Sequence, residues 1–197
     1  MEELDAVNML LRAIGSSPVN SLSNSHPEVV NARTTLRRVS KREQNRGWWF
    51  NIDYDVVYQR NSSNEISIPE EVVKFVAENA AYVKRGRKLY NNRDQTYKFE
   101  CDVTAVEQVR AFEWDECPTT LQLYAAYLAG AEFINDEIED TAKEDRFNQK
   151  AGLAKIELDK EDLQSMKVSV WHNPRIIRAR GGVMPYQRGN KGLRPNG

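Results

Sequence analysis

The chain has 197 residues, of which 29% are charged and 40% hydrophobic, which is typical of a globular protein with one substantial core or two small ones. No run approaches the roughly 18 apolar residues needed to cross a bilayer, and the acidic start Met1-Glu2-Glu3 is unlike a secretion signal. We therefore expect no membrane association and production in a cytoplasm. Cys101 and Cys117 could pair, but without a secretion signal two free thiols are the expected state.

Two amphipathic helices are expected before residue 47. Their apolar faces, at helical spacing, are Val7, Leu10, Leu11 and Ile14 in the first, and Val29, Ala32, Leu36 and Val39 in the second. Gly15 suits the C-terminal cap of the first helix, and Pro27 suits the first turn of the second. Gly47 ends the second helix, and Trp48, Trp49 and Phe50 follow it at once. Because aromatic side chains bury large apolar areas, this aromatic corner is predicted to lie buried where helix becomes strand.

The middle of the chain is predicted to form a small antiparallel sheet. Apolar and polar residues alternate over 50–58, and shorter strands are expected over 65–68, 97–101 and 103–109. Residues 82–90 read as two strands around Gly86, whose basic neighbours form a charged hairpin tip and lack the spacing of a phosphate loop. Residues 72–81 are ambiguous, because two glutamates after a proline suggest a helix start while the apolar residues favour a strand.

Two further helices are expected, the first opening at Cys117-Pro118 with Pro118 in its first turn. The first has closely spaced small residues at Ala125, Ala126, Ala129, Gly130 and Ala131, which let another helix approach. A polar stretch over 135–145 is expected to contain the connection, and Phe147, Ala151, Ala154 and Leu158 form the apolar face of the second helix. A short polar link predicts that the two helices pack antiparallel.

Charge is strongly segregated near the end of the chain. Residues 100–168 carry 17 acidic and 7 basic residues, whereas residues 169–197 carry 6 basic residues and no acid. Either tail and body have different neighbours, or an acidic solvated face is followed by a disordered tail. The tail also carries apolar anchors among its arginines, and its predicted partner-binding residues are Trp171, Arg175, Ile176, Ile177, Arg178, Arg180 and Tyr186.

The predicted fold class is therefore α+β, an antiparallel helical bundle with an inserted small antiparallel sheet and an extended basic C-terminal arm. The expected divisions are 1–47 with 116–168 for the helical body, 48–115 for the sheet insert, and 169–197 for the arm.

The basic second helix has two interpretations. Its cations, with Arg33, Arg37, Arg38 and Lys41 at the centre, form a stripe that could neutralise phosphates in a nucleic-acid-binding protein. The favoured alternative is a solvated face or a face that meets an acidic neighbour, because the pI is near 6.2 and no DNA-reading motif is present. The same four residues are candidates for a contact between copies of the chain.

Catalytic and metal-binding interpretations have little support. Acids crowd 113–116 and 132–145, so a carboxylate pair for peptidoglycan hydrolysis is available in number, but hydrolysis also needs a shaped sugar cleft and a raised pKa on one carboxylate. In a chain with 29 acids, chance proximity is the default interpretation. His26 and His172 stand far apart without a second ligand at helical spacing, and neither cysteine has a neighbouring histidine. We predict neither catalysis nor a cofactor.

An ordered set of motifs at the start of the chain resembles one protein family. Ile14, Gly15, Pro18 and Val19 are followed by Ser21 and Leu22, then by the basic helix, then by Gly47, Trp48, Phe50 and Asn51. This order is similar to the N-terminal region of the tail tubular protein A family, the adaptor or gatekeeper proteins of short-tailed bacteriophages, and the likeness extends over roughly residues 4–168. It also favours a strand over 72–81.

The resemblance implies a structural virion protein of the phage tail, assembled in the host cytoplasm. Members of that family form a dodecameric ring below the portal protein, attach the tail nozzle and the tail fibres, and leave a channel through which DNA passes without specific binding. Each protomer of such a ring needs two different complementary faces.

Overall fold

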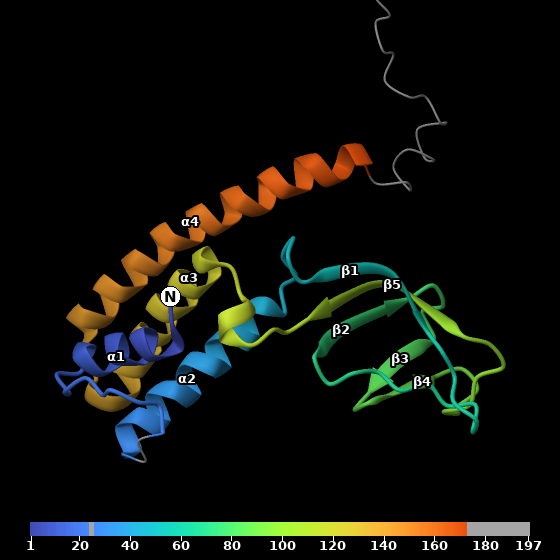
Figure 1. Ribbon diagram of the computed structural model, residues 1–197, viewed down its shortest axis with the longest axis horizontal. Coiled ribbons are helices and arrows are strands. Elements are labelled where there is room, and N and C mark those ends of the chain that lie inside the picture. Colours follow the sequence, from blue (N-terminus) through green and yellow to red (C-terminus); the bar gives the residue numbers. More distant parts are fainter. Residues whose placement is uncertain (24–25, 173–197) are drawn as a thin grey trace, which may run out of the picture. The chain divides into compact units, whose positions relative to one another are not determined.

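The computed structural model describes residues 1–23 and 26–172, which fold as α+β, as predicted (Figure 1). Its helices are α1 (Glu3–Ala13), α2 (Pro27–Gln44), α3 (Thr119–Ile138) and α4 (Thr141–His172), with a 3₁₀ turn η1 (Trp114–Glu116). Its strands are β1 (Ile52–Tyr58), β2 (Val72–Ala77), β3 (Tyr82–Arg85), β4 (Lys88–Asn91) and β5 (Val103–Arg110). Residues 1–162 form one compact unit.

Helices α1, α2 and α3 share one apolar core. The expected faces of the first two helices are buried except at Ile14, which is half-buried at the C-cap of α1, and α3 supplies mainly small residues opposite them. The core consists of Ala6, Val7, Leu10, Leu11, Val29, Ala32, Leu36, Val39, Trp114, Ala125, Ala126, Ala129 and Phe133. The small side chains of α3 let three helices pack closely around a single layer of larger residues.

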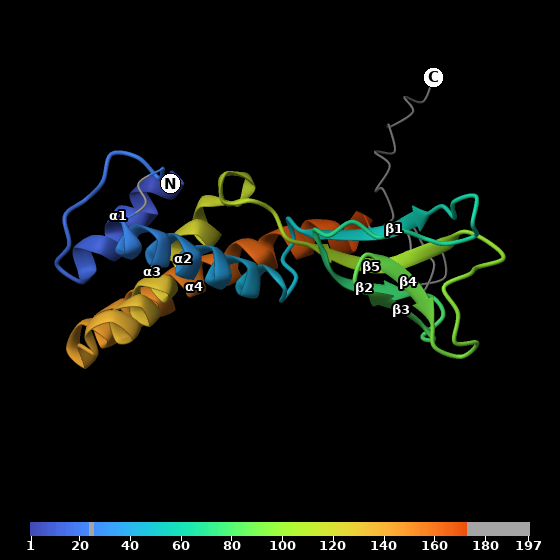
Figure 2. The same ribbon diagram turned by 90° about the horizontal axis from the view of Figure 1, so that it is seen from below.

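Helices α3 and α4 pack antiparallel, as their apolar faces predicted (Figure 2). Near one end, the ring of Phe147 lies against the α-carbon of Gly130. At the other end, the Thr120 hydroxyl donates a hydrogen bond of 2.7 Å to Glu161. The connection is shorter than the expected polar stretch, because α3 runs to residue 138 and α4 begins at residue 141. Most polar residues of 135–145 are therefore exposed helix positions.

Glycine and proline mark the helix ends, with one difference from expectation. Gly15 and Gly47 have φ angles of +87° and +81°, the left-handed conformation that favours glycine. Pro27 occupies the first turn of α2, as expected. Pro118 instead stands just before α3, with the extended backbone of an N-cap position.

The strands form a three-stranded antiparallel sheet in the order β1-β5-β2 and a separate β3-β4 hairpin. The ambiguous segment is the strand β2, and Gly86 occupies the hairpin tip, as predicted. Residues 65–68 and 97–101 are not strands but make isolated bridges, such as Glu65 with Lys98. Single buried side chains, including Ile66 and Phe99, hold these segments in the core, and intervening turns prevent a continuous ladder.

The aromatic corner lies where α2 leads into β1, as predicted, but only Trp48 is buried, whereas Trp49 and Phe50 are half-buried. Trp48 is 5% exposed and its indole donates a hydrogen bond of 2.9 Å to the Glu43 carbonyl. Asn51 is also buried: its side-chain oxygen accepts from the Trp48 amide at 2.7 Å, and its amide group donates to the Arg110 carbonyl at 2.7 Å. Gln44 exchanges two hydrogen bonds with the Phe112 backbone. These buried amides join the end of α2 to one end of the β1-β5 pair, where β1 begins and β5 finishes.

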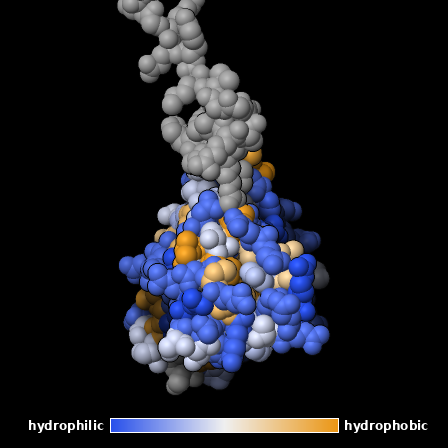
Figure 3. Space-filling model, turned by 90° about the vertical axis from the view of Figure 1, so that its right-hand side faces the viewer, coloured by the Kyte–Doolittle hydropathy of each residue, from blue (hydrophilic) through white to orange (hydrophobic). Residues whose placement is uncertain are grey.

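No helix in the described residues is long and apolar enough to span a membrane. Viewed from the side of the strands, the surface is mainly hydrophilic, with small separate apolar areas (Figure 3).

Candidate assembly surfaces

The basic face of α2 is largely neutralised within the chain. Arg33 and Arg37 both donate through Nε to the Glu3 carboxylate, at 3.1 and 2.7 Å. On the other side of the helix, Arg38 and Arg42 reach Glu132 of α3, at 3.3 and 2.7 Å. The helix therefore meets acidic neighbours of its own chain, which is one of the two interpretations that the sequence allowed.

The carboxylate of Glu3 is the centre of this arrangement. Burial by itself raises the pKa of Glu3, but hydrogen bonds and positive charge from Arg37 and Arg33 outweigh it and lower that pKa below 4.5. The hydrogen bond to Glu3 likewise raises the pKa of Arg37. Ion pairing of this kind leaves fewer free charges on α2 for binding phosphates.

The four residues expected at a contact between copies are therefore placed unequally. Arg33 and Arg37 are held by Glu3, and Arg38 lies beside Glu132. Lys41 is exposed and forms no ion pair with any residue that the structure describes. Of the four, Lys41 keeps the most freedom to meet another molecule.

A buried carboxylate in α2 was not singled out from the sequence. Glu43 is 2% exposed and lies 3.3 Å from Arg42 and 2.9 Å from Arg46, and it accepts a 3.2 Å hydrogen bond from the Tyr124 hydroxyl. Paired so completely, it is suited to fixing α2 against α3. Its spacing of one and three residues from two arginines was a local signal for this role.

An acidic surface surrounds the start of α1. The indole of Trp114 in η1 donates to the Met1 carbonyl at 2.9 Å, which brings η1 beside the N-terminal end of α1. The exposed acids here, which we call the acidic cap, are Glu2, Asp5, Glu113, Asp115 and Glu116. Within the described part of the chain, none of the five forms an ion pair.

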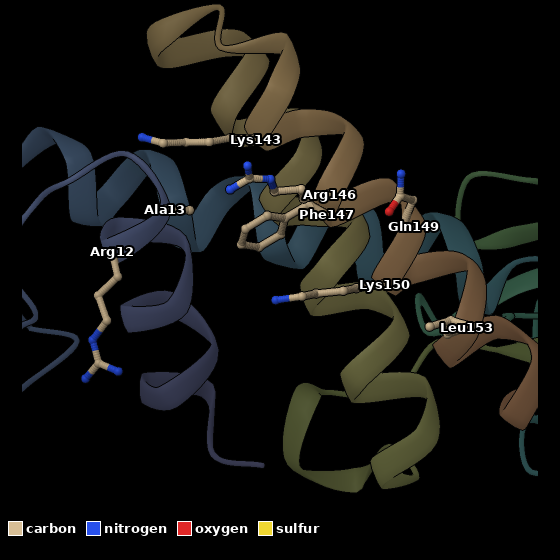
Figure 4. Close-up of a pocket in the computed structure, with 8 residues that line it drawn as sticks. All are labelled: Arg12, Ala13, Lys143, Arg146, Phe147, Gln149, Lys150 and Leu153. Carbon is tan, nitrogen blue, oxygen red and sulfur yellow. The ribbon is translucent and has the colours of Figure 1, made fainter.

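A basic groove of about 440 Å³ lies at the opposite end of α1, between that helix and α4 (Figure 4). We use the name for its lining residues, which are Arg12, Ala13, Lys143, Arg146, Phe147, Gln149, Lys150 and Leu153. Figure 4 shows Lys143, Arg146 and Lys150 extending from α4 towards α1, with the Phe147 ring among them. This groove was not predictable from the sequence, because its cations come from α1 and α4, which are far apart in the chain.

Comparison with known proteins identifies the family. The tail tubular protein family matches residues 4–168, which include nearly all of the described helices and strands. The chain belongs to the tail tubular protein family. It is also 24% identical over 170 residues to tail tubular protein A of Klebsiella phage KP34, covering 86% of this chain and 91% of that protein.

Membership in the tail tubular protein family makes this chain a structural component of a phage tail, which associates with other proteins of the virion. The resemblance in the order of helix, loop, basic helix and aromatic corner is thus confirmed.

The remaining candidate residues of this tail tubular protein are placed as follows. Both cysteines are free thiols: Cys101 is exposed and Cys117 buried. Burial, with the nearby charges of Glu116, Glu113 and Asp115, raises the pKa of Cys117 to about 12. No group of histidine, cysteine and carboxylate side chains in the described residues could hold a metal ion.

The predicted C-terminal arm lies mostly outside the described residues. This applies to Arg175, Ile176, Ile177, Arg178, Arg180 and Tyr186, and to the side chain of Trp171.

Proposed function

We propose that this tail component is a ring-forming adaptor that joins the phage portal to the tail nozzle and fibres and leaves a channel for DNA. The observation that carries the proposal is the family match over residues 4–168, together with a relative, named tail tubular protein A, that aligns over 91% of its own length. A protein of this kind works through surfaces, and both the acidic cap and the basic groove are exposed.

The ring would be built from one repeated contact. Copies related by rotation meet through two different faces, so each protomer presents both members of a complementary pair. Lys41, with the outer edges of Arg33, Arg37 and Arg38, is a candidate for part of that contact. Acidic side chains facing the channel would let DNA slide, because each contact with a phosphate would hold it back.

Assembly is expected to depend on the portal. The chain is 22.7 kDa and has no sustained heptad pattern that would hold copies together unaided. Light scattering should therefore show mainly monomers of the isolated protein, and negative-stain images of a mixture with its portal should show dodecameric rings. Portals that remain bare in such images would contradict the adaptor proposal, and a stable ring in dilute protein alone would contradict templated assembly.

The C-terminal arm is proposed to attach the ring to the portal. Apolar side chains such as Ile176, Ile177 and Tyr186 alternate with arginines, a pattern typical of segments that order on binding a partner with carboxylates. A chain ending at Val170 should keep the melting temperature of the full chain but bind portals weakly, and binding of the full chain should weaken with salt. Equal binding of the truncated and full chains would contradict this role.

A further inference from the structure

The unpaired cations of the helices are concentrated in the basic groove. Within the described residues, Arg12 and Arg146 form no ion pair, in contrast to the arginines of α2. Lys150 lies 5.6 and 5.7 Å from the ring centres of Tyr127 and Phe147 and has no carboxylate partner in that part of the chain. Only Lys143 has one, Asp140, at 3.7 Å.

The groove is a firmly built surface. Phe147 packs so closely on Gly130 that a β-carbon there would come within 2.4 Å of the ring, which fixes the rotation of α4 about its axis. Lys143, Arg146 and Lys150 are spaced three and four residues apart and therefore share one face of α4. Arg12, in the last turn of α1, completes the groove from the other side.

Apolar side chains continue the groove along α4. Leu153, which lines the groove, is 67% exposed, and Ile156, three residues further on, is 51% exposed. Large apolar side chains exposed beside uncompensated charge are typical of a surface that another protein covers. The groove thus favours a protein partner with acidic groups over a small anion.

The same chain presents a surface of the opposite charge. The acidic cap has five exposed carboxylates and lies at the first turn of α1, whereas the groove lies at its last turn. Because α1 is a rigid helix of 11 residues, it holds the two surfaces about 15 Å apart. They cannot meet within one chain, but they can meet between two chains joined head to tail.

We infer that the basic groove of one copy binds the acidic cap of the next copy. This inference rests on the proposed ring and names the contact that would build it: Arg12, Arg146 and Lys150 facing the acids around η1 of the neighbour. The contact joins two different faces, so it repeats from copy to copy and can close into a ring. Complementary charge also selects the head-to-tail orientation, because groove against groove and cap against cap both repel.

Charge exchange between the two surfaces tests the inference. The groove variant is Arg146→Glu with Lys150→Glu, and the cap variant is Glu2→Lys with Asp115→Lys. The cap variant spares Glu113 and Glu116, whose side chains cap η1, and uses Glu2, whose side chain makes no capping hydrogen bond to α1. Each full-length variant, and both together, would be supplied to a phage that lacks this gene, and infectious particles would be counted.

Each variant alone should lower the yield of infectious particles by about tenfold or more, because it places like charges on both faces of the contact. Supplied together, the two variants should restore the yield, because alternating copies again place opposite charges at every contact. A matched control, Arg93→Glu with Lys98→Glu, reverses two exposed cations outside the groove and should behave as the unaltered chain. Unchanged melting temperatures of the purified variants exclude a folding defect.

Two results would overturn the inference. One is a normal yield from either variant alone, since the contact would then not depend on these charges. The other is loss in both variants without restoration in the mixture, which would mean that the groove meets another partner, such as nucleic-acid phosphates. The adaptor proposal is tested separately, by whether images of the protein mixed with its portal show rings.

Discussion

The close contact between α3 and α4 can be tested with two glycines that differ only in their surroundings. Gly130 and Gly152 both lie inside helices, so alanine should stabilise each helix by about 0.5–1 kcal/mol. A β-carbon at Gly152 meets no atom within 4 Å, whereas one at Gly130 comes within 2.4 Å of two ring atoms of Phe147.

The steric cost at Gly130 should exceed the gain in helix propensity. The Phe147 ring must leave its place on α3, and overpacking of this kind costs about 1–3 kcal/mol. For a chain of this length, about 1 kcal/mol shifts the melting temperature by about 2–4 °C. We therefore expect Gly152→Ala to melt slightly above the unaltered protein and Gly130→Ala to melt about 2–12 °C below Gly152→Ala.

Circular dichroism melting of both variants measures the difference, and Phe147→Ala tests its cause. Once the ring is absent, Gly130→Ala should no longer destabilise, which would appear as a coupling of about 1–3 kcal/mol between the two positions. If Gly130→Ala melts as high as Gly152→Ala, the packing of α4 on α3 is not as described.

Three further predictions concern the buried corner, the α1–α2 ion pairs and the thiols. Trp48→Ala should lower the free energy of unfolding by about 3–5 kcal/mol, and an unchanged melting temperature would mean that the corner is exposed. Because the pKa of folded Glu3 is lowered, its ion pairs stabilise the protein above pH 4.5 and are lost as pH falls through the folded pKa. Denaturant titrations of Glu3→Gln should thus show a deficit of about 1 kcal/mol at neutral pH that vanishes in acid, and a deficit independent of pH would refute the assignment. A thiol reagent at pH 8 should modify Cys101 in the folded protein and Cys117 only after unfolding, since burial raises the pKa of Cys117 to about 12; equal rates would contradict its burial.

The residues of the candidate surfaces were only partly predictable. The sequence showed a basic second helix and acidic stretches at 113–116 and 132–145, but it did not show that Glu132 faces Arg38 and Arg42. Nor did it show the basic groove, because Arg12 and Lys143 are brought to one groove by the packing of helices that are not adjacent in the chain. Which charges remain unpaired depends on all the pairs formed elsewhere.

The sequence by itself determined the elements whose causes are local. Periodicity of apolar residues defined the helices and the longer strands, and Gly15, Gly47 and Gly86 marked turns where left-handed backbone is needed. The α+β class and the family followed from the same ordered pieces.

Tertiary structure alone decided the interactions between distant residues. Glu3 is paired with arginines 30 and 34 positions away. Glu43 is buried in contact with Arg42, Arg46 and Tyr124, the last of which belongs to another helix. The segments 65–68 and 97–101 form only isolated bridges, because a continuous strand needs a neighbouring strand with a free hydrogen-bonding edge. Both edges of β5 are already paired, with β1 and β2. These pairings depend on tertiary packing. The spacing of residues along the chain does not specify them, because the interaction energy of a side chain depends on the surface that the fold places against it.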